Sequence, residues 1–235
     1  MQLFYKENID STTKTITFDK EESRHIVKVL RKREDDILHI TNGKEQLFHA
    51  KITFANDKKC EAEIIETEHK PKPWAYYLHV AIAPTKNNDR FEWFLEKATE
   101  IGVDEITPII CQNSERKVVK TDRFEKIIQA AVKQSLKFTV PKLNEPISFS
   151  DFINQDFVSK VCIAHCEDEQ KKQLKLVVNP LEKITILIGP EGDFSSSEIK
   201  EAITKNHIPI SLGESRLRTE TAGVVAVHTV SIINQ

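Results

Sequence analysis

The chain has 235 residues, 39% of them hydrophobic, and a formal net charge of −2 at pH 7, so it can bury one large core or two smaller ones. This charge balance argues against nucleic-acid binding through bulk positive charge, but it does not exclude a local basic surface. No apolar run approaches membrane-spanning length, and the first residues lack the pattern of a signal peptide, so we expect a cytoplasmic protein.

Residues 1–70 contain short apolar runs with partial alternation, separated by turn signals such as Asn42-Gly43. Closely spaced short strands of this kind are typical of a small β-barrel. One helix is expected from Asp19, a favourable N-cap residue, with Glu22 three positions later as in a capping box. The expected strands are 15–18, 36–40, 47–52 and 61–65.

Pro71 and Pro73 indicate a stiff linker, because proline fixes φ and cannot donate to a β-ladder. From residue 74 to residue 235, apolar strand-like runs alternate with helical patterns. This alternation predicts a second domain of the α/β class, with a mainly parallel sheet and helices on both faces. The expected strands are 78–83, 106–110, 161–164, 184–188 and 208–212; the expected helices are 89–101, one that starts at 121, 195–205 and 221–234.

Two loops of the second domain carry glycines and ionisable residues directly after strands. Residues 189–195 read Gly-Pro-Glu-Gly-Asp-Phe-Ser, and residues 212–222 read Leu-Gly-Glu-Ser-Arg-Leu-Arg-Thr-Glu-Thr-Ala. Ligands of open α/β sheets bind outside the carboxyl ends of strands, where helix N-termini offer free N–H groups, so the two loops predict a cofactor pocket. Two simpler interpretations remain open: a tight strand-to-helix connection, and an Arg218–Glu220 salt bridge that braces the second loop.

Cys162, His165 and Cys166 lie close together in the sequence, which raises the question of a metal site. A zinc site needs about four ligands, usually in two paired clusters, and the sequence offers no second cluster. We therefore expect no metal, and reduced cysteines packed near the end of a strand.

The two loops resemble the ribosomal RNA small subunit methyltransferase E family of the SPOUT class, and the Arg-Thr-Glu-Thr-Ala string at 218–222 is the most specific part of the match. Residues 95–103 and 25–31 resemble two further elements of that family, so the resemblance spans nearly the whole chain. Three positions depart from the family pattern: Asp193 stands where a second glycine is usual, Lys137 where arginine is usual and Lys117 where serine is usual.

The resemblance implies a PUA-like β-barrel followed by a SPOUT domain whose tail threads a trefoil knot. It also implies a homodimer that binds S-adenosyl-L-methionine and methylates N3 of a uridine in 16S ribosomal RNA of the small ribosomal subunit. The cofactor-binding residues expected on this basis are Leu187, Ile188, Gly189, Pro190, Glu191, Gly192, Leu212, Gly213, Leu217, Arg218, Thr219, Thr221 and Ala222.

Methyl transfer to uracil N3 requires loss of the N3 proton, which calls for a base or for positive charge near the uracil oxygens. The catalytic candidates are Arg218, which would stabilise the uracil anion, and Glu220, which would take the proton or hold Arg218 in place. Glu191 is an alternative base.

A basic cluster in the first domain and several cations of the second predict contact with RNA phosphates. A solvated helix face is the simpler interpretation of the basic cluster. The RNA-binding candidates are Arg24, His25, Lys28, Arg31, Lys32, Lys86, Arg90, Arg116 and Arg123. Two alternatives to the ribosomal RNA enzyme stay open: a SPOUT-type methyltransferase acting on another RNA such as transfer RNA, and a non-catalytic RNA-binding protein.

Overall fold

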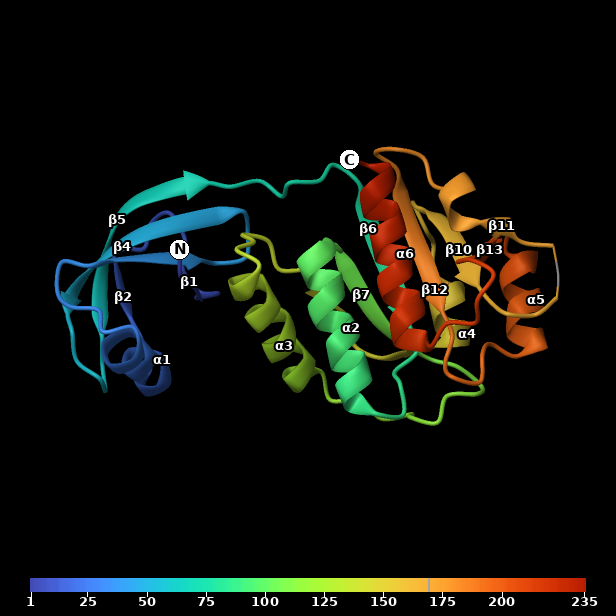
Figure 1. Cartoon of the computed structure of the whole chain (residues 1–235), viewed down its shortest axis with the longest axis horizontal. Helices are drawn as coiled ribbons and strands as arrows, with labels where there is room; N and C mark the ends of the chain where they lie inside the picture. The colour runs from blue at the N-terminus through green and yellow to red at the C-terminus, as the bar shows by residue number, and fades with distance from the viewer. Residues whose placement is uncertain (169) are drawn as a thin grey trace. The chain divides into compact units, whose positions relative to one another are not determined.

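The computed structural model describes residues 1–168 and 170–235, and its contacts divide the chain into two compact units (Figure 1). The first unit comprises Met1–Pro73 with Val132–Val140, and the second comprises Trp74–Ala131 with Pro141–Gln235. Residues 132–140 thus pack with the first unit, where the N–H of Glu45 donates to the carbonyl of Phe138 at 2.8 Å. No helix of the described residues is long and apolar enough to cross a membrane.

The first unit is a five-stranded, mostly antiparallel sheet with a short helix. Its strand order is β1-β3-β4-β5-β2, and only the β1–β3 pair is parallel. The side chain of Asp19 caps the helix by accepting the N–H of Glu22 at 2.8 Å, as the sequence predicts. The elements are β1 (Leu3–Tyr5), β2 (Thr15–Thr17), α1 (Lys20–Arg24), the π-helix His25–Val29, β3 (Ile37–Thr41), β4 (Gln46–Phe54) and β5 (Glu61–His69).

The π-helical turn changes which side chains the first helix buries. A helix of regular period from Asp19 would bury Ile26 and Val29 together, yet Ile26 is fully buried and Val29 is 65% exposed. The wider π turn, in which the N–H of Leu30 donates to the carbonyl of His25, rotates Val29 out of the core. Val29 therefore lies at the surface within the basic cluster.

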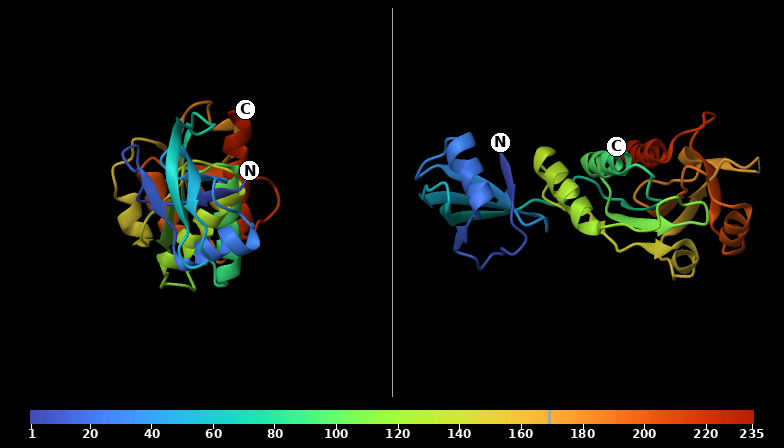
Figure 2. Two further views of the ribbon diagram at one scale, coloured as in Figure 1. Left: turned by 90° about the vertical axis from the view of Figure 1, so that its left-hand side faces the viewer. Right: turned by 90° about the horizontal axis from the view of Figure 1, so that it is seen from below.

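The second unit is a parallel eight-stranded sheet covered by helices on both faces, which confirms the predicted α/β class. Its strand order is β11-β13-β10-β12-β6-β7-β8, with β9 paired to β7. Helices α2 and α6 pack against each other on one face, and α4 and α5 lie over the other (Figure 2). The elements are β6 (Tyr77–Ile82), α2 (Asn88–Ile101), β7 (Glu105–Ile110), α3 (Thr121–Gln134), β8 (Lys142–Leu143), β9 (Ile147–Ser148), α4 (Phe149–Ile153), β10 (Lys160–Ala164), β11 (Lys172–Gln173), the 3-10 helix Leu174–Leu176, β12 (Lys183–Ile188), α5 (Ser196–Thr204), β13 (Ile208–Ser211) and α6 (Thr219–Ile233).

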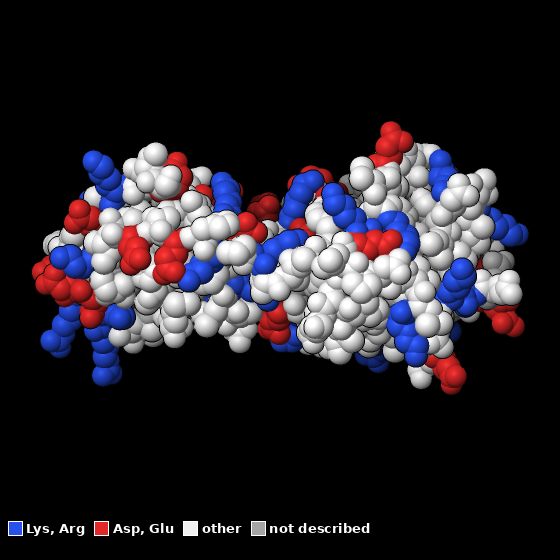
Figure 3. Space-filling model, turned by 90° about the horizontal axis from the view of Figure 1, so that it is seen from above, with Lys and Arg blue, Asp and Glu red and all other residues white. Residues whose placement is uncertain are grey.

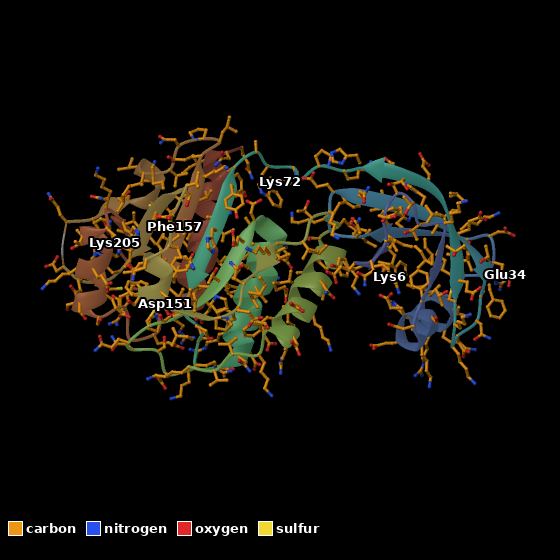
Figure 4. The ribbon with its side chains drawn as sticks, turned by 180° about the vertical axis from the view of Figure 1, so that it is seen from behind. Lys6, Glu34, Lys72, Asp151, Phe157 and Lys205 are labelled. Carbon is orange, nitrogen blue, oxygen red and sulfur yellow. The ribbon has the colours of Figure 1, made fainter. Side chains whose placement is uncertain are left out.

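Alternate residues of the strands serve the two faces of this sheet. Leu187 of β12 and Ala81 of β6 belong to the apolar cluster under α4 and α5. Aromatic side chains extend this cluster toward the edge of the sheet: the Phe157 ring, labelled in Figure 4, lies 5.3 Å from Phe152 and 5.7 Å from His207. The sheet is therefore a rigid support, and the loops at the carboxyl ends of its strands are free to form a site.

Candidate active site

A cavity of about 630 Å³ opens at the carboxyl ends of β10, β12 and β13. The last residues of these strands, Ala164, Ile188 and Ser211, all line it. Because β10 lies between β13 and β12, the two loops predicted from the sequence are separated by a third loop, which follows β10. This volume is within the range of small-molecule sites, and its position is the one at which open α/β sheets bind ligands.

The loop after β12 forms the first wall. At Gly189 a Cβ would lie 3.0 Å from the backbone nitrogen of Phe194, so the close turn favours glycine there. Ser195 and Glu198 form the capping box that the sequence predicts at the start of α5. The Glu198 carboxylate also accepts the N–H of Gln112 at 2.8 Å, which joins the loop after β7 to this helix.

The loop after β13 forms the opposite wall. Gly213 has φ +138°, and a Cβ placed there would have no atom within 4 Å, so the chain leaves open space at this point. The hydroxyl of Thr219 donates to the carbonyl of Gly189 at 3.1 Å and ties the two walls together. Arg218 is the N-cap residue of α6; its exposed side chain lines the cavity and has no hydrogen-bond or ion-pair partner among the described residues.

The third wall comes from the loop after β10, which sequence reasoning did not assign to the site. It contributes His165, Cys166 and Lys171. Burial raises the pKa of the Cys166 thiol, and the nearby Asp193 carboxylate raises it further, so the thiol stays protonated and uncharged. Within the described residues, no three His, Cys, Asp or Glu side chains stand together in a way that could hold a metal ion.

Glu220 is placed differently from Arg218. Its carboxylate is buried in the first turn of α6, does not line the cavity, and lies 3.8 Å from Nε of Arg90 on α2. One carboxylate oxygen, Oε2, has no hydrogen-bond partner among the described residues. The ion-pair partner of Glu220 is thus Arg90 rather than Arg218, and the positive end of the α6 dipole adds to the stabilisation of this buried charge.

Glu191 lines the cavity, but its carboxylate is hydrogen-bonded to the protein backbone. Its Oε1 accepts the backbone N–H of Lys86 at 2.9 Å. The Lys86 ammonium pairs with Glu115 at 2.8 Å, and the Arg116 guanidinium donates to the Lys86 carbonyl at 3.0 Å. The loop that leads into α2 is therefore fixed to the wall of the cavity through Glu191.

The RNA-binding candidates fall into two groups. In the second unit Lys86, Arg90, Arg116 and Arg123 all have protein partners; the guanidinium of Arg123 lies 2.6 Å from Glu92. In the first unit the candidates make weaker contacts with the protein. Lys28 forms a long ion pair of 3.7 Å with Asp57, and the Nζ of Lys32 donates to the carbonyl of Ile37 at 3.5 Å. Arg24 and Arg31 are exposed, and the ring of His25 lies 6.2 Å from that of Phe4. On the face drawn in Figure 3, positive and negative side chains are interspersed, in keeping with the small net charge.

Comparison with known proteins gives matches along most of the chain. A model described as RNA methyltransferase domain matches residues 72–231, and one described as RNA methyltransferase PUA domain matches residues 18–65. The protein named Ribosomal RNA small subunit methyltransferase E from Buchnera aphidicola subsp. Acyrthosiphon pisum is 33% identical, over 89% of this chain and 85% of its own length. The protein of the same name from Mesomycoplasma hyopneumoniae is 34% identical, over 85% of this chain and 86% of its own.

The chain belongs to the ribosomal RNA small subunit methyltransferase E family. Solved structures agree with this assignment. A probable rRNA-methyltransferase from Porphyromonas gingivalis has a TM-score of 0.93 and 38% identity, covering 100% of this chain and 98% of that one. A Ribosomal RNA small subunit methyltransferase E from Neisseria gonorrhoeae, bound to S-adenosyl methionine, has a TM-score of 0.86 and 26% identity, with coverage of 100% and 98%. The family match confirms the predicted enzyme class, RNA methyltransferase, and the predicted PUA domain.

Most of the cofactor-binding residues expected for this family come together at the cavity. Three do not line it: Leu187 points into the apolar cluster under α4 and α5, Gly192 faces Asn113, and Thr221 is half-buried in α6. The expected residues that line the cavity are Ile188, Gly189, Pro190, Glu191, Leu212, Gly213, Leu217, Arg218, Thr219 and Ala222. The third wall could have been predicted from the short apolar run 161–164. In a parallel sheet, the carboxyl end of this strand lies at the same edge as the two predicted loops.

Proposed function

We propose that this chain transfers a methyl group from S-adenosyl-L-methionine to N3 of a uridine in 16S ribosomal RNA, in the cytoplasm and as a homodimer. The observation that carries the proposal is the cavity walled by the loops after β12 and β13, in a chain of the ribosomal RNA small subunit methyltransferase E family. A member of that family from Neisseria gonorrhoeae is bound to S-adenosyl methionine.

The residues around the cavity fit this cofactor. The half-buried side chains of Leu212 and Leu217 offer apolar surface for an adenine ring, and the open space at Gly213 admits close approach of a ligand to the backbone. The wall also carries both signs of charge, which suits a ligand with a carboxylate, an ammonium group and a sulfonium. The charged wall residues are Glu191, Asp193, Glu214, Lys171, Arg216 and Arg218. When bound, the cofactor supplies an electrophilic methyl group.

Arg218 is the catalytic residue of this proposal. Its guanidinium is on the cavity wall and unpaired among the described residues, so it can approach the oxygens of a uracil ring without first breaking an ion pair. Positive charge there stabilises the uracil anion that forms when N3 gives its proton to solvent water at the cavity mouth, and so lowers the barrier to forming a nucleophilic nitrogen. The carboxylates act through other groups: Glu220 with Arg90 fixes the start of α6, and Glu191 holds the Lys86 loop.

Ligand binding and product analysis test the cofactor and the catalytic residue separately. Isothermal titration with S-adenosyl-L-methionine is expected to give saturable binding to the wild type and to Arg218→Ala. The variant is expected to form at least 100-fold less N3-methyluridine, detected by mass spectrometry of nucleosides from 30S subunits of a strain that lacks the gene, because one preorganised charge contact contributes about 10²–10³ in rate. Lys205→Ala, at the end of α5, is the matched control.

Absence of cofactor binding by the wild type would rule out the cavity assignment. Near-normal turnover by Arg218→Ala would rule out its role. A different methylated nucleoside, or methylated transfer RNA in place of ribosomal RNA, would keep the enzyme class and replace the substrate.

The basic cluster of the first unit supports the RNA part of the proposal. Arg24, Lys28 and Arg31 are exposed around the π-helical turn and carry one weak ion pair among the described residues. RNA affinity is therefore expected to fall steeply as salt rises, and Arg24→Ala with Arg31→Ala is expected to reduce that slope by about two. A slope that does not change on removal of these two charges would move the RNA contact away from this cluster.

An apolar surface on the second unit supports the homodimer. Ile232 of α6 is 55% exposed, and Leu176 and Leu181 nearby are 74% and 68% exposed. The N–H of Leu181 donates to the side chain of Asn234 at 2.7 Å, which fixes this loop beside the end of α6. Exposed apolar side chains that lie near one another are suited to association with a second copy of the chain.

We expect Ile232→Asp to convert a dimer to a monomer in light scattering coupled to size exclusion. Ile65→Asp, at a residue 54% exposed in the first unit, is the matched control. A wild-type protein that is monomeric at all concentrations would contradict the dimer.

A further inference from the structure

Asp193 has a backbone conformation that most L-residues avoid. Its φ is +63°, in the left-handed region, at the end of the loop after β12. Aspartate tolerates this region better than most residues, but glycine adopts it without steric cost. At this position an aspartate side chain can accept hydrogen bonds that glycine cannot.

The carboxylate of Asp193 binds two backbone N–H groups. Oδ2 accepts the N–H of Cys166 at 2.7 Å, and Oδ1 accepts the N–H of Phe194 at 2.8 Å. Cys166 belongs to the loop after β10, so the first bond crosses from one wall of the cavity to the next. Hydrogen bonds to an ionised acceptor are about twice as strong as neutral ones, which makes this a firm link between loops.

The backbone of Asp193 is held as well. Its N–H donates to the carbonyl of Pro190 at 2.9 Å, and its carbonyl accepts the side-chain amide of Asn113 at 3.1 Å. Asn113 belongs to the loop after β7. One residue thus joins the loops that follow β7, β10 and β12, and two of these three loops line the cavity.

Two cations, Lys171 and Arg216, line the cavity beside this link. Burial and the Asp193 carboxylate raise the pKa of the Cys166 thiol, whereas Arg216 and Lys171 lower it, and the net shift is upward. The Lys171 ammonium is bound to the carbonyl of His165, so it closes the loop after β10 from the other side. Among the described residues, the loop after β10 is held by Lys171 within the loop, by Ser196 of α5 through the Glu167 carboxylate, and by Asp193 from the loop after β12.

We propose that Asp193 is a positioning residue for the cofactor: by binding the Cys166 N–H from a left-handed backbone, it holds the loops after β10 and β12 in the geometry that accepts S-adenosyl-L-methionine. This inference rests on the proposed cofactor. It predicts that loss of the carboxylate weakens cofactor binding without loss of the fold. Replacement by glycine allows this test, because glycine adopts the left-handed conformation without strain.

Asp193→Gly is the principal test. The variant is expected to remain folded with a small fall in Tm, because relief of the backbone strain offsets part of the loss of two hydrogen bonds. It is expected to bind S-adenosyl-L-methionine about tenfold more weakly in isothermal titration, and to show a raised KM for the cofactor with kcat within twofold. Amide hydrogen exchange of Cys166 in the cofactor-free protein is expected to become much faster, which reports the link directly. Asp193→Asn, which keeps one acceptor oxygen without the charge, is expected to lie between the two proteins.

Asn206→Gly is the matched control, since Asn206 has φ +62° in the same unit and does not line the cavity. Equal weakening by Asn206→Gly and Asp193→Gly would assign the effect to general flexibility and overturn the proposal. So would unchanged cofactor affinity in Asp193→Gly, or continued protection of the Cys166 amide. Failure of the wild type to bind the cofactor would instead overturn the proposed function, and the exchange of the Cys166 amide would still decide whether Asp193 links the loops.

Discussion

Replacement of Gly223 by alanine tests how closely α6 packs on α2. A Cβ at Gly223 would lie 2.6 Å from Cδ2 and Cε2 of Phe94 and 2.9 Å from Cδ1 of Ile82. Both neighbours are fully buried, so neither can turn toward solvent. The added methyl group can be accommodated only if the ring or the helix moves.

Two opposing effects set the size of the change. Alanine favours a helix over glycine by about 1 kcal/mol, whereas overpacking of a core costs about 1–3 kcal/mol. With three contacts shorter than 3.0 Å, the upper end of the overpacking range applies. The net loss of unfolding free energy is then about 2 kcal/mol, which corresponds to a fall in Tm of about 4–8 °C for a chain of this size.

Thermal unfolding followed by circular dichroism measures this change, and cofactor titration adds a second observable because Thr219 and Ala222, in the first turn of α6, line the cavity. Phe94→Leu provides the control: the double variant should lose less stability than the sum of the two single variants, since the smaller side chain leaves room for the methyl group. An increase in Tm for Gly223→Ala alone would refute the close packing of α6 on Phe94.

Three further predictions concern buried or paired ionisable groups. Burial lowers the pKa of His79 from 6.5 to about 4, so between these pH values the unfolded chain binds a proton that the folded chain does not. The free energy of unfolding is therefore highest above pH 6.5 and falls by at most about 3 kcal/mol as the pH drops toward 4. Urea unfolding of His79→Gln should show a flatter pH dependence. Arg90→Ala leaves the Glu220 carboxylate buried without its cation, and we expect a lower kcat with an unchanged salt dependence of RNA binding; a reduced salt slope would show that Arg90 contacts phosphate instead. Glu198→Ala removes the capping box of α5 and an acceptor for a neighbouring loop, and we expect urea unfolding to report about 1–3 kcal/mol less stability, with the exposed Glu201→Ala on the same helix as control.

The sequence predicted the elements that local patterns determine. The capping box at Ser195, the N-cap at Asp19 and the alternation of strands and helices in the second unit all follow from short-range preferences. The wall residues between 188 and 191 and between 212 and 222 could be named because their loops combine glycine with charge after a strand.

Features that depend on tertiary arrangement could not be predicted in this way. The position of β10 between β13 and β12 is set by long-range strand pairing, so the contribution of Cys166 and Lys171 to the cavity was missed. The π-helical turn that exposes Val29 breaks the regular period on which helix prediction depends. Connection rules argue against threaded chains, so local patterns could not predict the trefoil knot. The knot follows from the family resemblance and stays a prediction.

The bond from the Lys86 N–H to Glu191 has a practical consequence for mutagenesis. Lys86 and Arg116 look like phosphate contacts, yet both help to fix a segment that is anchored to the cofactor wall. An alanine scan of these cations scored by methylated RNA alone would therefore mix two causes, weaker capture of the nucleic acid and a displaced methyl-donor pocket. Each such variant needs its donor affinity measured in the absence of RNA before its basic side chain is counted as part of the RNA footprint.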